Sequence, residues 1–272
     1  MSSKHPNATR EELGQRTDLG IMHSVKMTAP IVYSAPVTGY HVRHHRRFDL
    51  FGGSKPWDKT EWTAQDDRLR GGISTSHLTI HPIPGSSLDS PGTIATFYGN
   101  LDTKTLGGAG FASQRTVGDD RRWDLNDYYG IEVVVLIPPS NTGLIELDDE
   151  PTPAPIKERI YTIVVKDCII RGEPDAGKEI SWEWNFKPKF GKEELEEAEH
   201  HHKKGPVKQY FKANWGDFKA FYRGRPVDVG KRLDVGRIKR VSIMIRSFFQ
   251  EQQDGDFSVS LVSISAVGGG EA

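Results

Sequence analysis

The chain has little cysteine, no long apolar run and almost no net charge. Its 272 residues include one cysteine, Cys168, so no intrachain disulfide can form and a reducing compartment is favoured over secretion. No stretch of about eighteen apolar residues occurs, so no membrane span is predicted. Because 36 basic and 37 acidic residues leave a formal charge of -1, global charge points to neither nucleic acid nor an acidic surface as the partner.

Familiar catalytic and metal-binding motifs are also missing. The sequence contains no H-E-x-x-H, no paired C-x-x-C, no G-x-S-x-G and no phosphate-binding G-x-x-x-x-G-K-[ST]. The three histidines at 200–202 lie in a charged run and are expected to be solvated rather than to form a metal site. Cys168 ends an apolar strand candidate, which predicts a buried, inert thiol. We therefore predict no catalytic residue, no cofactor and no metal ligand.

Short strand candidates separated by turn signals follow one another through the chain. They cover residues 76–83, 93–98, 110–115, 130–137, 159–168, 179–186, 207–213, 240–245 and 256–267. The continuous apolar run at 130–137 is typical of a strand buried on both faces. In 256–267 the apolar phase changes between Leu261 and Val262, which predicts a β-bulge or a bend. The pattern indicates an all-β sandwich or jelly-roll.

The chain divides by composition into an arm and one domain. Residues 1–45 are polar and weakly periodic, and are predicted to form a mobile N-terminal arm. Residues 46–268 are predicted to form the β-sandwich domain. Within it, residues 187–206 contain KEELEEAEHHHKKG, which has no apolar stripe and is expected to be a charged insertion.

Two segments admit more than one interpretation. The glycine-rich stretch 97–115 contains a partial G-x-G pattern, but a strand rather than a helix follows it, so a β-hairpin turn is favoured over a phosphate cradle. Trp182, Trp184 and Phe186 share one face of a strand. Core packing is favoured for this stripe, with a sugar-stacking platform as the alternative. The paired acids are typical of turns. Asp66 is the exception that we single out as a candidate for another role, because it precedes a region that contains Arg68, Gly71, Gly72 and Ser74.

Several segments together resemble the complex I intermediate-associated protein 30 family. In order along the chain they read DDRLRGGIS from 66, FYGNLDTKTLGGAGFASQR from 97, WDLNDYYGIEVVV from 123, YTIVVKD from 161, FKANWGDFKAFYRGRPV from 211 and IKRVSIMIRSFFQEQQDGDFSVSLVSI from 238. They span residues 57–267. The resemblance implies a galactose-binding-like β-sandwich and a non-enzymatic, chaperone-like factor that binds assembly intermediates of the mitochondrial NADH dehydrogenase, shielding apolar surface until the correct partner docks.

The resemblance also implies a set of binding or framework residues. They are Asp67, Arg68, Gly72, Ser74, Gly110, Phe111, Arg115, Trp215, Phe218, Arg223 and Gln252. Because an internal arginine needs a carboxylate partner, we expect Asp67 or Asp127 to hold Arg115.

Partner and compartment follow from the same resemblance. It implies protein partners, namely subunits or assembly intermediates of respiratory complex I, and a mitochondrial location. The early acidic residues Glu11, Glu12 and Asp18 are atypical of a mitochondrial presequence. A cytosolic paralogue with a different protein client is therefore the alternative. Two further functions also stay open: a carbohydrate-binding module and, least favoured, a hydrolase with two carboxylates across a cleft.

Overall fold

The computed structural model of the protein describes residues 46–83, 92–137, 158–169, 179–189, 207–247 and 253–268. The predicted arm at 1–45 and most of the predicted insertion at 187–206 lie outside the described residues.

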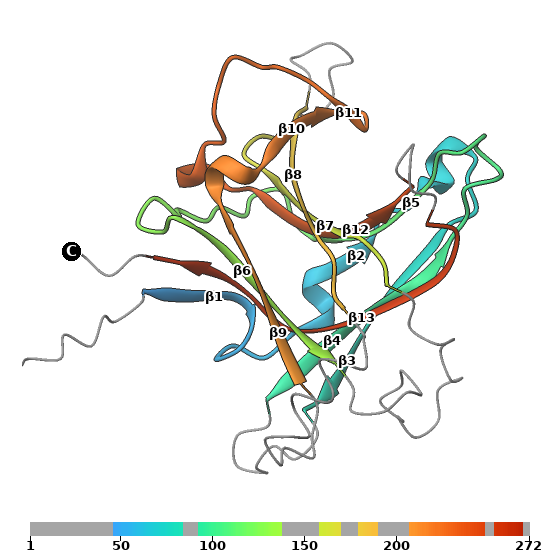
Figure 1. Ribbon diagram of the computed structural model, residues 1–272. Helices are drawn as coiled ribbons and strands as arrows, with labels where there is room; N and C mark the ends of the chain where they lie inside the picture. Colours follow the sequence, from blue (N-terminus) through green and yellow to red (C-terminus); the bar gives the residue numbers. More distant parts are fainter. Residues whose placement is uncertain are drawn as a thin grey trace, which may run out of the picture. The chain divides into compact units, whose positions relative to one another are not determined.

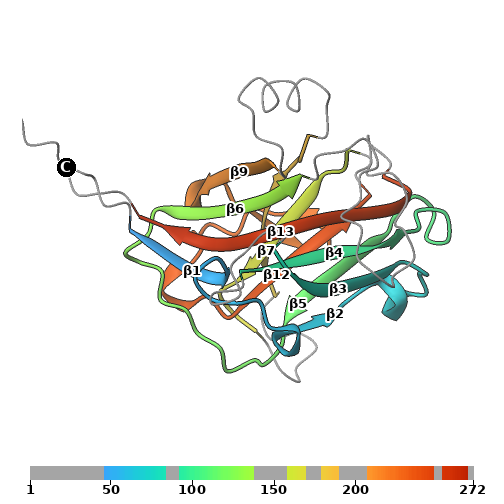
Figure 2. The same cartoon turned by 90° about the horizontal axis from the view of Figure 1, so that it is seen from below.

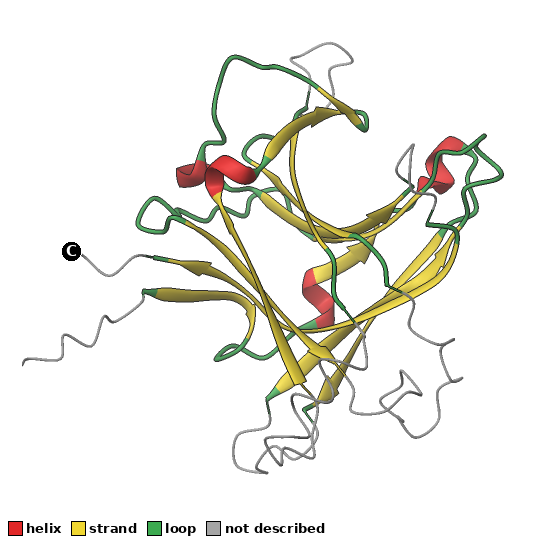
Figure 3. Cartoon of the chain, in the orientation of Figure 1, coloured by secondary structure: helices red, strands yellow, loops and turns green. Residues whose placement is uncertain are grey.

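The described chain forms two antiparallel β-sheets (Figures 1 and 3). Sheet A has the order β3-β4-β13-β6-β9, with β1 also paired to β13. Its strands are β1 (Arg47–Gly52), β3 (Thr75–Pro82), β4 (Thr93–Leu101), β6 (Gly130–Ile137), β9 (Val207–Asn214) and β13 (Gly255–Val267). In Figure 2 these strands face the viewer, with the second sheet behind them.

Sheet B has the order β11-β10-β8-β7-β12-β5-β2. Its strands are β2 (Trp62–Ala64), β5 (Phe111–Thr116), β7 (Tyr161–Lys166), β8 (Ser181–Phe186), β10 (Lys219–Tyr222), β11 (Arg225–Pro226) and β12 (Arg240–Arg246). Short 3₁₀ turns join some strands: η1 (Lys59–Glu61), η2 (Asp67–Arg70), η3 (Trp215–Asp217) and η4 (Val235–Arg237). The all-β sandwich expected from the sequence is confirmed.

The apolar core lies between the sheets and follows the period-two pattern of the strands. Every residue of β6 is buried, which confirms the strand predicted to be buried on both faces. Its odd-numbered residues enter the main core, while Val134 and Leu136 on the other side join a small apolar cluster with Ile94 and Val262. The stripe of Trp182, Trp184 and Phe186 also packs in or against the main core. These aromatic rings are therefore not a surface platform.

β13 is the long central strand of sheet A. Its first half pairs with β4 and its second half with β1, while β6 lies along its other side. The register with β6 shifts between Leu261 and Ser263, which confirms the predicted bulge. The bulge allows Leu261 and Ile264 both to enter the main core, although their spacing breaks strict alternation.

The glycine-rich stretch at 97–115 is not a hairpin, so that prediction is wrong. β4 lies in sheet A and β5 in sheet B, and the segment between them crosses from one sheet to the other. The physical reason is that β4 already has a neighbour on each side, β3 and β13, so its backbone has no free edge for β5.

Cys168 is exposed, contrary to the prediction of a buried thiol. The reason is that β7 ends at Lys166 and the chain leaves the sandwich before reaching the thiol. Within the described ranges, no helix is both long and apolar enough to cross a lipid bilayer.

Candidate functional site

Five of the predicted site residues meet at one end of the sandwich, around the carboxylate of Asp67. This side chain is fully buried and accepts hydrogen bonds from the N–H of Ser74 (3.1 Å), the hydroxyl of Ser74 (2.7 Å) and the N–H of Phe111 (3.1 Å). Ser74 leads into β3 of sheet A, whereas Phe111 begins β5 of sheet B. The carboxylate therefore ties the two sheets together.

Asp66 repeats this arrangement one residue earlier. Its carboxylate accepts from the N–H (3.2 Å) and hydroxyl (2.6 Å) of Ser76 on β3, and from the N–H of Ser113 on β5 (3.0 Å). The amide of Gln114 adds a bond to the Ser76 hydroxyl (3.0 Å). A buried carboxylate that accepts several N–H and O–H bonds is well satisfied. The Asp-Asp pair is therefore framework, with no reactive group exposed.

The two glycines of this cluster are required by space. A Cβ on Gly72 would lie 2.3 Å from the Asp67 carboxylate carbon. A Cβ on Gly110 would lie 2.2 Å from the carbonyl oxygen of Asp102. Both approaches are closer than non-bonded contact permits, so the motif glycines let the backbone close around the buried acid.

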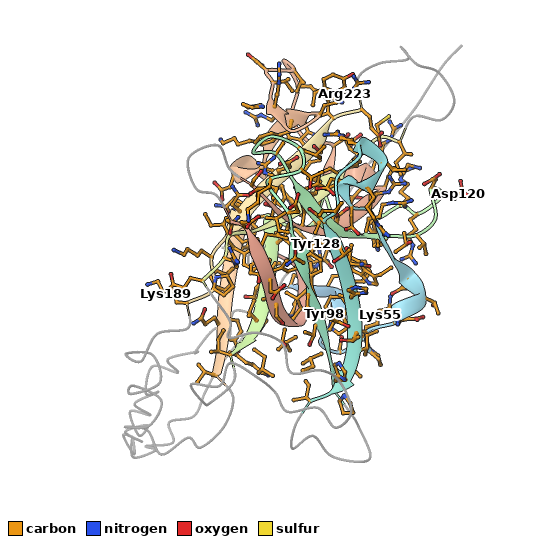
Figure 4. All side chains as sticks on the ribbon, turned by 90° about the vertical axis from the view of Figure 1, so that its right-hand side faces the viewer. Lys55, Tyr98, Asp120, Tyr128, Lys189 and Arg223 are labelled. Carbon is orange, nitrogen blue, oxygen red and sulfur yellow. The ribbon has the colours of Figure 1, made fainter. Side chains whose placement is uncertain are left out.

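The remaining predicted residues do not gather in one place. Arg68 is on the surface and its guanidinium reaches Asp66 at 3.5 Å. Phe218 is buried, and Trp215 packs against it with ring centroids 5.8 Å apart. Arg223 sits with φ +52° at the tip of the β10–β11 hairpin, at the top of Figure 4. Gln252 lies outside the described residues.

Arg115 points to the outer face of sheet B, where a second polar cluster lies. Alternation with the core residues places on this face Phe111, Ser113 and Arg115 of β5, Arg240, Ser242, Met244 and Arg246 of β12, Thr162, Val164 and Lys166 of β7, Ser181, Glu183 and Asn185 of β8, and Lys219 and Phe221 of β10. In Figure 1 the sheet is bowed, with the β10–β11 hairpin rising at one side and η2 at the other. We refer to this surface as the outer face of sheet B.

A row of cations crosses one end of this face. Arg115 on β5 is opposite Ser242 on β12, and Arg240, two residues along β12, is therefore its diagonal neighbour. Lys166 on β7 lies directly opposite Arg240. Arg240 pairs with Asp119 at 2.5 Å and Lys166 with Glu179 at 2.8 Å. The row therefore has three cations but only two carboxylates, and Arg115 is the cation without an ion pair among the described residues.

Arg246 lies across the middle of the same face. It starts on β12, yet its guanidinium reaches Glu183 on β8 at 2.7 Å and lies 4.6 Å from the Phe221 ring on β10. Because β7 separates β12 from β8, the side chain must pass over β7. This crossing is consistent with the burial of Thr162 and Val164, which point outward but are 0% and 7% exposed.

Burial shifts the pKa of three ionisable groups on this face, Arg115, Arg246 and Glu183. Burial lowers the pKa of Arg115, and the like charge of Arg240 lowers it further, with partial relief from Asp119 and Glu179. Burial also lowers the pKa of Arg246 against the favourable charge of Glu183. Burial raises the pKa of Glu183, opposed by Arg246 and by a hydrogen bond from Ser181. All three directions show that burial disfavours the charged forms here.

The expected partner of Arg115 is wrong. Its Nη1 donates a hydrogen bond to the carbonyl of Thr116 (3.2 Å), whereas Asp67 accepts from Ser74 and Phe111 and Asp127 pairs with Arg46. Asp67 lies in the polar cluster that joins the two sheets, while Arg115 points out of sheet B. The hypothesis failed because it placed on one side two residues that the pleat separates.

Sequence reasoning missed most of this face. Arg240, Arg246 and Glu183 alternate with core residues inside strands that are recognisable by their apolar phase alone. The signal was present in the polar phase of the same strands, since a charge between two aromatic residues, such as Glu183 between Trp182 and Trp184, is unusual on an ordinary surface strand. In the described ranges, no group of three or more His, Cys, Asp or Glu side chains gathers in a way that would hold a metal ion.

Solved structures resemble this chain in fold only. A family 11 carbohydrate-binding module from Clostridium thermocellum, in complex with a β-1,3-1,4-mixed-linked tetrasaccharide, is 12% identical, with a TM-score of 0.48 over 83% of this chain and 98% of that one. A family 11 module of the cellulosomal cellulase Lic26A-Cel5E of the same organism is 12% identical, with a TM-score of 0.46 over 84% and 96%. The fold described above, two antiparallel sheets packed as a β-sandwich, rests on the structure of this chain itself.

The sequence comparisons are more specific. An uncharacterized protein of Schizosaccharomyces pombe is 39% identical over 220 residues, which cover 80% of this chain and 83% of the relative. The family model described as complex I intermediate-associated protein 30 matches residues 50–137 and 159–261. The matched residues include both sheets, the Asp66–Asp67 cluster and the cationic row. The chain therefore belongs to the complex I intermediate-associated protein 30 family.

Proposed function

We propose that this protein is a non-enzymatic assembly factor that holds a partner protein against the outer face of sheet B. The observation that carries the proposal is the family match, which covers most of the sandwich domain. The name of that family refers to intermediates of complex I, so the client that we propose is a set of partly assembled subunits of mitochondrial complex I, and the proposed site of action is the mitochondrion. The factor acts by covering surface that is exposed only until the next subunit docks.

The geometry supports this face over others. Charged groups that are buried and incompletely neutralised gain most from a partner that supplies the missing charge. The outer face of sheet B holds such groups on neighbouring strands: Arg115 and Arg240 each have a buried Nε without a hydrogen-bond partner. Its carboxylates Asp119, Glu179 and Glu183 each have a paired cation, an arrangement that suits recognition better than acid–base chemistry.

A sugar-binding role is less well supported. That role needs an aromatic platform, and Trp182 and Trp184 pack in or against the core. On the outer face of sheet B, Phe111 and Phe221 are each capped by an arginine, Arg70 at 5.5 Å and Arg246 at 4.6 Å. A sugar would have to displace these guanidinium groups to stack.

The test is affinity capture with the tagged full chain from mitochondrial and cytosolic fractions, read by quantitative mass spectrometry. Met244→Trp places a bulky side chain on the outer face of sheet B, and Tyr210→Ala on β9 of sheet A is the matched control. We expect complex I subunits with the unmodified chain and the control, and about tenfold less with Met244→Trp, which corresponds to about 1.4 kcal/mol. Recovery of no complex I subunit would remove this client, and recovery of another protein from the cytosolic fraction alone would favour the cytosolic paralogue.

A further inference from the structure

Arg115 is the one cation on β5, β7 and β12 of the outer face of sheet B that has no ion pair among the described residues. Its Nη1 donates to the Thr116 carbonyl, whereas its Nε is buried and has no hydrogen-bond partner. Among the described residues, no carboxylate lies within ion-pair distance of its guanidinium. A guanidinium carries five N–H donors and stays charged, so burial without an anion is unfavourable.

Its neighbours make the shortage of negative charge larger. Arg240 is diagonal to Arg115 across β5 and β12, and its own Nε is also buried without a hydrogen-bond partner. Asp119 and Glu179, the nearest acids, are bound to Arg240 and Lys166. The end of the face near Arg115 therefore has donors and positive charge left over.

We propose that Arg115, with Arg240 beside it, is a receptor for one carboxylate of an acidic peptide segment in the partner protein. That the partner is a protein rests on the proposed function, whereas the anion site rests on the contacts above. A carboxylate matches the two-pronged donor geometry of arginine. It also relieves the repulsion between Arg115 and Arg240, so binding lowers a cost that the free protein already carries.

The surrounding acids determine which anion fits. Asp119, Glu179 and Glu183 lie on or beside the same face. They repel a polyanion that extends its charge over several residues, such as a nucleic-acid backbone. One carboxylate with neutral neighbours can reach Arg115 without approaching them. An acidic peptide is therefore favoured over a nucleic acid.

The experiment is calorimetric titration of the full chain with acetyl-Gly-Gly-Glu-Gly-Gly-amide, which carries one carboxylate between neutral residues, with the same peptide carrying glutamine in place of glutamate as the uncharged control. We expect binding of the glutamate peptide only, weakened by added salt. Arg115→Gln should weaken that binding at least about tenfold. Arg115→Lys keeps the charge but lacks the two-pronged donor, so it should weaken binding by a smaller factor, and it carries the test if the glutamine variant does not fold. Arg46→Gln, on an exposed arginine that pairs with Asp127 outside this face, should leave binding unchanged.

Equal binding by the unmodified chain and Arg115→Gln would overturn the proposal. So would a single-stranded oligonucleotide that binds through Arg115 while the glutamate peptide does not. If complex I subunits are never captured but the peptide still binds through Arg115, the client is wrong and the anion site stands. If Arg115→Gln captures subunits as well as the unmodified chain does, the site is wrong and the assembly role stands.

Discussion

The outer faces of the two sheets each carry a partly buried arginine, and the two arginines differ in how many hydrogen-bond acceptors surround the guanidinium. On sheet A, Arg47 donates to Glu132, to Asp49 at 2.8 Å and to the hydroxyls of Ser263 and Ser265 at 2.8 Å each. On sheet B, Arg115 donates to a backbone carbonyl through Nη1, and its buried Nε has no partner. One arginine is saturated by its own chain and the other is not.

The pKa directions follow from this difference. Burial alone would lower the pKa of Arg47, but its hydrogen bonds and charge interactions with Glu132 and Asp49 more than reverse this and raise it. The pKa of Arg115 stays lowered, by burial and by Arg240. A saturated ion network stabilises the fold, whereas an unsaturated one is available to a ligand. Arg47 is therefore an arginine that stabilises the fold, whereas Arg115 is an arginine whose charge is available to a bound partner.

The largest effect should come from removing each arginine in turn. Arg47→Met leaves Asp49 without its cation and Glu132 with only the exposed Lys212, and should cost about 3 kcal/mol of unfolding free energy. Arg115→Met removes a guanidinium that no described carboxylate neutralises, and should change stability by less than about 0.5 kcal/mol. Urea denaturation of both variants and of the unmodified chain measures the two changes in unfolding free energy. Equal losses for the two variants would end the distinction between the faces.

A somewhat smaller effect should appear at low pH, where the contribution of Asp49 to the unfolding free energy is lost. Burial would raise the pKa of Asp49, but hydrogen bonds from Ser265, Ser54 and Arg47 outweigh it and lower the pKa from 3.8 to about 2. Because the folded pKa is depressed, Asp49 stabilises the fold above pH 3.8 and loses this contribution as the pH falls towards 2. The contribution is about 2 kcal/mol.

Asp49→Asn should therefore be less stable than the unmodified chain at pH 6, and the gap should close as the pH approaches 2. Urea midpoints at a series of pH values give this difference. A gap that does not depend on pH would show that the Asp49 carboxylate is not selectively stabilised by folding.

The smallest effect concerns Glu183 on sheet B, whose contribution to stability should fall rather than rise as the pH increases. Burial raises the pKa of Glu183 above its ordinary 4.5, so the folded state holds the proton to higher pH than the unfolded chain does. Through this group, stability is greatest below pH 4.5 and declines as the pH rises through the raised pKa. Glu183→Gln should flatten that decline in thermal melts from pH 4 to pH 7. A decline of unchanged slope in the variant would assign it to another group.

Prediction from sequence succeeded where a local pattern carries the information. The apolar run of Gly130–Ile137 indicated a strand buried on both faces, and the phase change at Leu261 indicated a bulge, because pleat geometry ties side-chain direction to position along one strand. The hairpin predicted for 97–115 failed because two consecutive strands can belong to different sheets, and local turn residues do not report which edge is free.

The candidate site shows the same limit. Motif residues such as Asp67, Ser74 and Gly110 were identified as a set, but their joint role as a tie between sheets depends on contacts between strands distant in sequence. The outer face of sheet B was not identified, because Arg115, Arg240 and Glu183 come from three strands whose order in the sheet differs from their order in the chain.

The sequence by itself determined the β-sandwich class, the family and the motif residues that the family shares, because alternation and motif order are written along a single chain. Only the tertiary structure decided which of those residues are framework and which are left with unmet charge. Whether an arginine is neutralised depends on distances of a few ångströms to groups on other strands, and strand order and register alone set those distances.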